Sequence, residues 1–144
     1  MKVVVQRVTE ANVTVSNKVI GSINEGLLVY VGFTLEDTEE HVNKMIQKII
    51  KLRIFEDSEQ KMNLNILDVK GSCLLISQFT LYADASKNNR PSFTKALNRE
   101  KASLLYQTFV KKMKEFIPTE EGEFGADMKI ASINNGPVTI IIEI

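Results

Sequence analysis

The sequence contains few of the residues from which hydrolytic and metal sites are most often built. It has one histidine, one cysteine and no tryptophan among 144 residues. A Ser-His-Asp triad needs a histidine beside its nucleophile, and a structural zinc site needs four Cys or His ligands. His41 stands among Glu39, Glu40 and Lys44 at helical spacing, where we expect an ordinary surface side chain. The sequence therefore predicts no histidine-based triad, no metal site and no cofactor.

The single Cys73 cannot form a disulfide within the chain, and it lies in an apolar run where a thiol behaves as a small buried hydrophobe. The apolar stretch after Met1 is too short for the core of a signal peptide, and no apolar span approaches the ~20 residues of a membrane helix. We expect a soluble, cytoplasmic protein without a membrane partner.

An excess of one charge is also lacking, because 18 Lys and Arg residues balance 18 Asp and Glu residues. A nucleic acid would have to be held by a local basic patch, and no DNA partner is expected. One group of cations lies close together in sequence and comprises Lys87, Arg90, Lys95, Arg99 and Lys101. This group is either a surface for RNA phosphates or an ordinary solvated face.

The chain has enough length and apolar content for one domain covering residues 1–144, since such a domain buries roughly two-thirds of its unfolded surface. Alternating and continuous apolar patterns predict strands over 3–8, 11–15, 18–23, 27–31, 52–55, 72–79, 128–133 and 138–144. One helix is predicted after the N-capping residues Asp37 and Thr38, with its apolar residues at 42, 45, 46, 49 and 50.

A second helix is predicted between Asn98, as its N-cap, and Pro118, which ends it. Its apolar stripe comprises Ala102, Leu105, Tyr106, Phe109, Val110, Met113, Phe116 and Ile117. Strands with two helices inserted between them describe a mixed α+β domain. We expect two packed sheets, partly barrel-like, with both helices layered on one face.

The main candidate site is the point where the apolar run 73–76 ends in Ser77, Gln78, Phe79 and Thr80. A strand covered on both faces can hold polar groups rigidly at its end. No strong base is near in sequence, so the chemistry there has to need little acid-base help. Hydrolysis of an activated ester fits, because donors aimed at the developing oxyanion commonly contribute most. Alternatively, Ser77 and Thr80 only close the strand and begin a turn.

A second candidate is the segment Asn134-Asn135-Gly136-Pro137-Val138-Thr139. A Gly-Pro peptide can present its carbonyl groups to a ligand, because Gly permits close approach and Pro fixes the backbone angle. Alternatively, the segment is a tight turn between two strands.

These two motifs together resemble those of the D-aminoacyl-tRNA deacylases. The resemblance extends to the opening residues 2–8 and to Arg90-Pro91-Ser92-Phe93, in the same order and spacing along the chain. It implies a homodimeric enzyme that hydrolyses the ester bond of D-aminoacyl-tRNA, and also of glycyl-tRNA, and releases the amino acid and the tRNA.

The resemblance also implies roles for individual residues. The catalytic floor and oxyanion site would consist of Ser77, Gln78, Phe79 and Thr80. A cis peptide between Gly136 and Pro137 would face the partner's pocket and exclude L-amino acids. We add to this substrate-binding set Asn134, Val138, Thr139 and Arg7, and to the tRNA-binding set Lys87, Arg90, Lys95 and Arg99.

Main-chain carbonyls suit this selection, because they bind groups that all amino acids share and clash with any L side chain. The ribose 2′-hydroxyl beside the ester can assist the attack. Thr80 is either a nucleophile or a positioning and oxyanion group, and we favour the second role, with attack by water. The rival functions are a non-catalytic dimeric RNA-binding domain and a general serine or threonine esterase.

Overall fold

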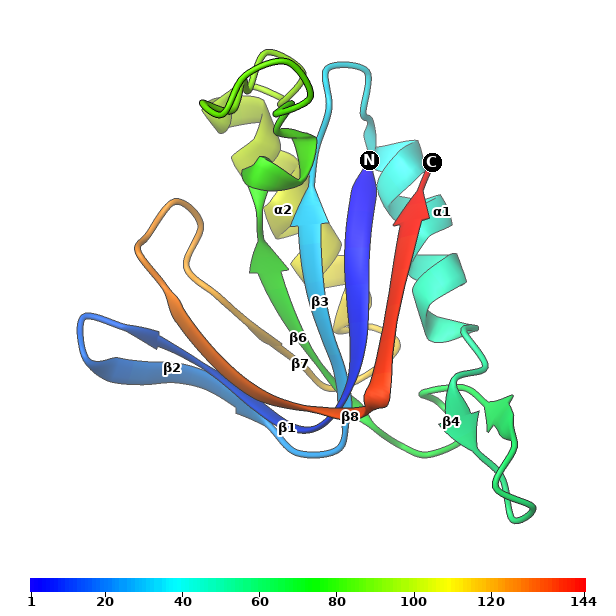
Figure 1. Ribbon diagram of the computed structural model, residues 1–144. Helices are drawn as coiled ribbons and strands as arrows, with labels where there is room; N and C mark the ends of the chain where they lie inside the picture. Colours follow the sequence, from blue (N-terminus) through cyan, green and yellow to red (C-terminus); the bar gives the residue numbers. More distant parts are fainter.

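The computed structural model describes residues 1–144 as a strongly bent six-stranded sheet, a small two-stranded sheet and two α-helices (Figure 1). The predicted mixed α+β, near-barrel fold is confirmed. The large sheet contains β1 (Lys2–Val15), β2 (Lys18–Ile23), β3 (Gly26–Gly32), β6 (Ser72–Ser77), β7 (Thr119–Glu121) and β8 (Lys129–Glu143). The other elements are β4 (Phe55–Glu56), β5 (Met62–Leu64), α1 (Glu39–Ile50), α2 (Arg99–Met113) and the 3₁₀ helix η1 (Phe79–Tyr82).

Strand β1 organises the sheet, because three strands pair with it. Its first half is antiparallel to β3, from Lys2 opposite Gly32 to Val8 opposite Gly26, and its second half is antiparallel to β2. Ser16 and Asn17 both have positive φ, as a tight turn in this long hairpin requires. Strand β8 pairs with the other edge of β1 along almost its whole length.

Two of the predicted strand boundaries are wrong. The predicted strands 3–8 and 11–15 are one strand, because Glu10 still pairs with Ile133 of β8. The predicted strands 128–133 and 138–144 are likewise one strand, in which the Gly-Pro segment shifts the register without ending the pairing. Such a bulge keeps the strand continuous on both sides of the extra residues.

The central strands β3 and β6 run parallel and are covered on both faces, as their continuous apolar sequences predicted. Leu27, Leu28, Leu74 and Leu75 are all 0% exposed. One face carries the helices, whose core residues include Val42, Met45, Ile46 and Ile49 of α1 and Tyr106, Phe109 and Met113 of α2. The other face packs against the bent hairpin through Val8, Val13 and Ile23. Figure 1 shows β1 and β2 curving away from the helices.

The predicted helix starts are confirmed, since Thr38 and Asn98 are the N-cap residues of α1 and α2. The Asn98 side chain accepts a hydrogen bond from the Lys101 N–H at 3.0 Å. The predicted end of α2 at Pro118 is wrong. The helix ends at Met113, and Phe116 is exposed rather than part of the buried stripe. Pro118 disfavours helical backbone at the residue before it, so the chain leaves the helix earlier.

The short strand predicted at 52–55 also lies elsewhere, because pairing begins only at Phe55, in β4. Ile54 and Phe55 are nevertheless buried in the helix-side core, which explains the apolar pattern. None of the helices is long and apolar enough to cross a membrane.

Candidate active site

The predicted site lies where β6 ends. The strand stops at Ser77, two residues before the end predicted for it. Ser77 is the last strand residue and is paired with Val31, and the Gln78 N–H donates to the Val31 carbonyl at 2.7 Å. The chain then turns into η1. Gly32 allows this turn, because a Cβ there would lie 2.9 Å from the Gln78 carbonyl oxygen and 3.0 Å from Leu81 Cβ.

The polar groups of η1 are arranged around Thr80. The Gln78 Nε2 donates to Thr80 Oγ1 at 2.5 Å, which orients the hydroxyl. The N–H groups of Phe79 and Thr80 belong to the first turn of the helix, where no carbonyl of the helix can accept them. The site therefore presents one hydroxyl and two backbone donors on a rigid strand end.

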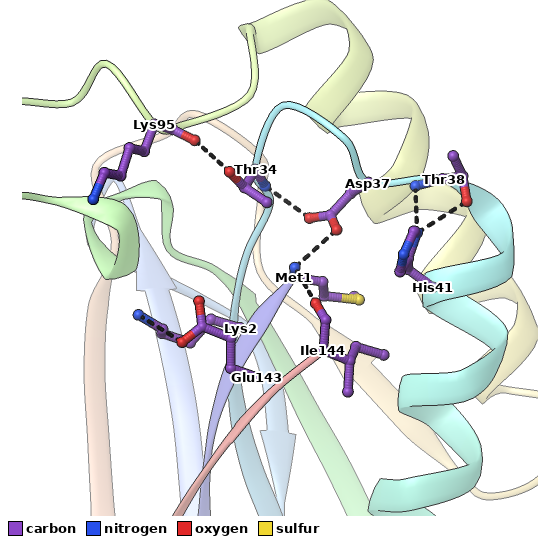
Figure 2. Close-up of polar contacts among 9 residues, drawn as sticks. All are labelled: Met1, Lys2, Thr34, Asp37, Thr38, His41, Lys95, Glu143 and Ile144. Carbon is purple, nitrogen blue, oxygen red and sulfur yellow. Dashed lines mark hydrogen bonds and ion pairs between the residues drawn. The ribbon is translucent and has the colours of Figure 1, made fainter.

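No imidazole lies beside Thr80 to act as a base. His41 stands in the first turn of α1, where its Nδ1 accepts the Thr38 backbone N–H at 3.1 Å (Figure 2). The Cys73 thiol is fully buried, and burial raises its pKa to about 12, so it stays protonated. The structure contains no group of three or more His, Cys, Asp or Glu side chains placed to hold a metal ion.

A pocket of about 520 Å³ opens beside the strand end, with Ser77, Gln78 and Phe79 in its wall. Thr80 is exposed and does not line it. The remaining wall comes from β6, from α2 and the residues just before it, and from β8 and the segment before it. These residues are Ile76, Leu97, Arg99, Ala102, Phe124, Gly125, Ala126, Met128 and Ile130.

Apart from Arg99, sequence reasoning missed this remaining wall. Phe124 and Met128 lie in or next to residues 120–127, an acidic stretch with two glycines whose sequence predicts an irregular connection. The apolar side chains of these two residues could have indicated a pocket wall, because loops exposed to solvent are usually polar.

One member of the predicted cationic group, Arg99, lines this pocket. Lys87, Arg90, Lys95, Arg99 and Lys101 are all exposed, and none of them takes part in an ion pair. Arg99 lines the pocket and lies across Gly125, where a Cβ would be only 2.7 Å from its Nη2. Five positive side chains are thus free to meet an anionic ligand.

The second predicted motif forms the bulge between β1 and β8. Asn134 pairs with Val8 and Thr139 with Gln6, so four β8 residues face Arg7 alone. Within the bulge the Gly136–Pro137 peptide bond is cis. The Asn134 side chain closes the bulge, because its Oδ1 accepts the Val138 N–H at 3.1 Å and its Nδ2 donates to Thr139 Oγ1 at 3.0 Å.

Arg7 fastens this bulge to the rest of the molecule. It is only 6% exposed. Its Nε donates to the Asn135 carbonyl at 3.0 Å, and its Nη1 donates to the Ile54 carbonyl at 2.7 Å. Glu56 lies 3.8 Å from its Nη2 and provides the nearest negative charge. A buried guanidinium thus connects the Gly-Pro bulge to the segment that leads into β4.

The two motifs do not meet within one chain. The register connects Asn134 through Val8 and Gly26 to Ser72, at the opposite end of β6 from Ser77. At about 3.3 Å per residue and 4.8 Å per strand, the bulge lies on the order of 20 Å from the strand-end site. Any pocket made from both motifs has to take them from different chains.

Comparison with known proteins identifies the family of the chain. A family model described as D-Tyr-tRNA(Tyr) deacylase matches residues 4–143. A solved structure described as "c-Myc DNA Unwinding Element Binding Protein" is 41% identical, with a TM-score of 0.94 over 99% of this chain and 98% of that one. Another, described as "Structural Analysis of a probable eukaryotic D-amino acid tRNA deacylase", has the same fold at 16% identity, with a TM-score of 0.86 over 99% and 98% of the two chains. The chain therefore belongs to the D-Tyr-tRNA(Tyr) deacylase family, enzymes that hydrolyse the ester bond of D-aminoacyl-tRNA.

Proposed function

We propose that the enzyme removes D-amino acids and glycine from tRNA at a site that two copies of the chain share. One chain supplies the Ser77–Thr80 strand end, and its partner supplies the Gly136–Pro137 peptide. The observation that carries this proposal is the separation of the two motifs, on the order of 20 Å within one chain.

The chemical step is attack by water on the ester carbonyl. The N–H groups of Phe79 and Thr80 are placed to stabilise the developing oxyanion, a contribution of about 10²–10³ in rate per donor in other hydrolases. Thr80 acts as a positioning group, because the group that contacts its hydroxyl is the Gln78 amide nitrogen, a donor that cannot act as a base. The ribose 2′-hydroxyl beside the ester assists the attack.

The apolar pocket binds the terminal nucleoside of the tRNA. Its volume of about 520 Å³ and its mostly hydrophobic wall suit a flat, uncharged base. Lys87, Arg90, Lys95 and Arg99 then contact the phosphates that follow, since they are exposed and form no ion pair. Base and phosphate contacts together would hold the ester at the strand end.

The free edge of β8 is the surface on which the second copy docks. Strand β8 pairs only with β1, so its other edge is open along Lys129–Glu143. Ile133 and Ile141 are 54% and 67% exposed, which leaves an apolar edge strand uncovered in the single chain. Long exposed edges of this kind are covered in stable proteins, commonly by another copy.

Selection against L-amino acids follows from the Gly-Pro peptide. Its backbone carbonyls bind the α-ammonium group, which D-amino acids and glycine share, and leave no room for an L side chain. Arg7 holds the peptide in place through the Asn135 carbonyl. We further propose a cytoplasmic location, on the grounds that the one cysteine is a free thiol and the substrate is an aminoacyl-tRNA.

The test follows ester loss from D-tyrosyl-tRNA, L-tyrosyl-tRNA and glycyl-tRNA with purified enzyme. We expect rapid loss of the D and glycyl esters, a stable L ester and no burst of acyl-enzyme. Equal hydrolysis of all three would instead indicate a general esterase, and hydrolysis of none would indicate an RNA-binding domain. A burst equal to the enzyme concentration would make Thr80 a nucleophile.

A further inference from the structure

Two phenylalanine side chains lie exposed beside the strand-end site. Phe79, the first residue of η1, is 57% exposed, and Phe93, in the loop between η1 and α2, is 41% exposed. Their ring centroids lie 5.1 Å apart and the ring planes are inclined by 57°, an arrangement that the charge distribution of aromatic rings favours. These two rings, the phenylalanine pair, form one apolar surface that is open to a ligand.

The loop that carries Phe93 is held by hydrogen bonds on both sides of the ring. Before it, Asp84 and Ser92 exchange two backbone bonds, in which the Asp84 N–H donates at 2.8 Å and the Ser92 N–H at 2.9 Å. After it, Thr34 Oγ1 donates to the Lys95 carbonyl at 2.7 Å (Figure 2). Because the backbone is already fixed, a ligand that binds the ring has little conformational entropy to remove.

The phenylalanine pair continues the active-site pocket outward. Phe79 belongs to the pocket wall, whereas Phe93 contacts Phe79 from outside that wall. Arg90 and Lys95 flank Phe93 in the sequence, are exposed and form no ion pair. Proteins bind single-stranded nucleic acids with this combination of exposed aromatic rings and free cations. The cores of protein–protein interfaces are depleted of charged side chains, so the two cations favour a nucleic acid over a second protein chain.

We propose that the phenylalanine pair is the subsite for the nucleotide that precedes the terminal one in the single-stranded 3′ end of the substrate, and that the base of this nucleotide stacks on Phe93. The inference rests on the proposed function, because it takes the terminal nucleoside to occupy the pocket. Stacking uses the flat face that every base has, so the subsite holds a base without reading its hydrogen-bonding groups. Phe93 is a binding residue and takes no part in the chemical step.

The subsite also gives the strand a direction. A terminal nucleoside bound alone can enter the pocket in more than one orientation. A strand held at two successive bases enters with its 3′ end innermost, which brings the ester to the Ser77–Thr80 strand end. Fixing the orientation of a reacting group in this way is a general source of rate enhancement.

The experiment measures the binding of two short oligoribonucleotides that carry no amino acid. One has the sequence CCA, in which tRNA ends, and the other lacks only the middle base but keeps its ribose and both phosphates. A fluorescent label at the 5′ end reports binding through anisotropy. Because the phosphate charges are the same, the ratio of the two Kd values reports the middle base alone. We expect the wild type to bind CCA about tenfold more tightly.

A matched pair of substitutions assigns this ratio to Phe93. Phe93→Leu removes the ring but keeps an apolar side chain, so the variant should bind both oligoribonucleotides equally, with the affinity of the wild type for the one without the middle base. Phe116→Leu makes the same change at a ring that is 45% exposed beyond the C-terminal end of α2, and the tenfold ratio should remain about as it is. With D-tyrosyl-tRNA, Phe93→Leu should raise KM about tenfold and leave kcat near the wild-type value, because the lost contact is made equally before and during the reaction.

Equal binding of the two oligoribonucleotides to the wild type, or binding of neither, would overturn the proposal without any variant. A loss in Phe116→Leu as large as that in Phe93→Leu would also overturn it, because it would show a general loss of structure. If Phe93→Leu changed the molecular mass in solution and left the Kd ratio unchanged, the phenylalanine pair would belong to an interface between chains instead. A base-dependent ratio in a protein that leaves D-tyrosyl-tRNA intact would support the subsite and refute the proposed function.

Discussion

The strand-end site and the Gly-Pro bulge are built in different ways. The strand end is backbone held by the parallel pair β3 and β6, whose Leu28, Val29 and Leu74 are fully buried. The bulge is an interruption at the edge of the sheet, held by the side chains of Arg7 and Asn134. A rigid core thus fixes the groups that carry the reaction, whereas a few polar side chains fix the groups proposed to select the substrate. Rate and selectivity should therefore be separable by mutation.

The largest effect is expected from Gly32→Ala, which acts on the strand end alone. The new Cβ would lie 2.9 Å from the Gln78 carbonyl oxygen and push η1 away from β3. We expect kcat for D-tyrosyl-tRNA to fall about 10²-fold, with L-tyrosyl-tRNA still intact. Gly71→Ala is the matched control, since its nearest contact is a side-chain atom, Ile66 Cγ1 at 3.1 Å, and the nearest backbone atoms lie 3.3 Å away. A similar loss of rate in both variants would contradict the assignment.

Arg7→Met should affect the bulge and its attachment to the segment before β4, and leave the strand end intact. The substitution keeps most of the volume but leaves the Asn135 and Ile54 carbonyls without their donor. Unpartnered buried groups cost about 1–3 kcal/mol each, so the free energy of unfolding should fall by about that amount or more. We expect hydrolysis of L-tyrosyl-tRNA to rise about tenfold relative to the D ester, because the bulge carries the groups proposed to exclude the L side chain. Unchanged selectivity in folded Arg7→Met protein would remove Arg7 from this role.

The cationic group should affect binding of both stereoisomers equally. Replacing Lys87, Arg90 and Lys95 by Gln removes three exposed charges that form no ion pair. If the contacts resemble those to a duplex, the loss of each phosphate contact should make the negative slope of log K against log salt concentration shallower by about 0.9. Titrations of tRNA binding at several salt concentrations measure this slope. An unchanged slope would show that the group is only a solvated face.

The smallest effect concerns Cys73 and the pH dependence of stability. Burial raises its pKa to about 12, whereas an unfolded thiol has a pKa of about 8.5. The unfolded chain therefore releases this proton first, and above pH ~8.5 stability falls by up to about 1.4 kcal/mol per pH unit. Urea unfolding between about pH 8 and 9.5 should show this slope in the wild type and not in Cys73→Ala. Equal slopes would assign the loss to other groups.

Local patterns were sufficient for most of the fold. The buried strands Gly26–Gly32 and Ser72–Ser77 and the two N-caps could be predicted, because apolar runs and capping residues act over a few neighbouring residues. The continuity of β1 and β8 could not, because it depends on pairing between Glu10 and Ile133, far apart in sequence. The pocket wall was missed for the same reason: Phe124 and Met128 meet Ser77 only through the tertiary fold.

The motifs predicted which residues form the candidate site, but they did not predict how those residues are arranged. Ser77, Gln78 and Phe79 do line a pocket, whereas Thr80 stands outside its wall and contacts Gln78. Hydrogen bonds from Asn134 and Arg7 to the bulge involve residues whose positions no local pattern determines. The distance between the two motifs follows only from the strand register, which the sequence did not predict.

The central claim, that two chains share one site, is tested most directly by mixed dimers. Gly136→Ala should relax selectivity, because its Cβ would lie 2.8 Å from Val138 Cγ2 and 3.0 Å from Arg7 Nη2. Gly32→Ala chains hydrolyse the ester slowly but keep an intact bulge. In purified dimers of one Gly136→Ala chain and one Gly32→Ala chain, the working strand end faces an intact bulge, so D selectivity should return to the wild-type value. A partner that carries both substitutions should give no such rescue. Selectivity that stays relaxed in the mixed dimer would contradict a shared site.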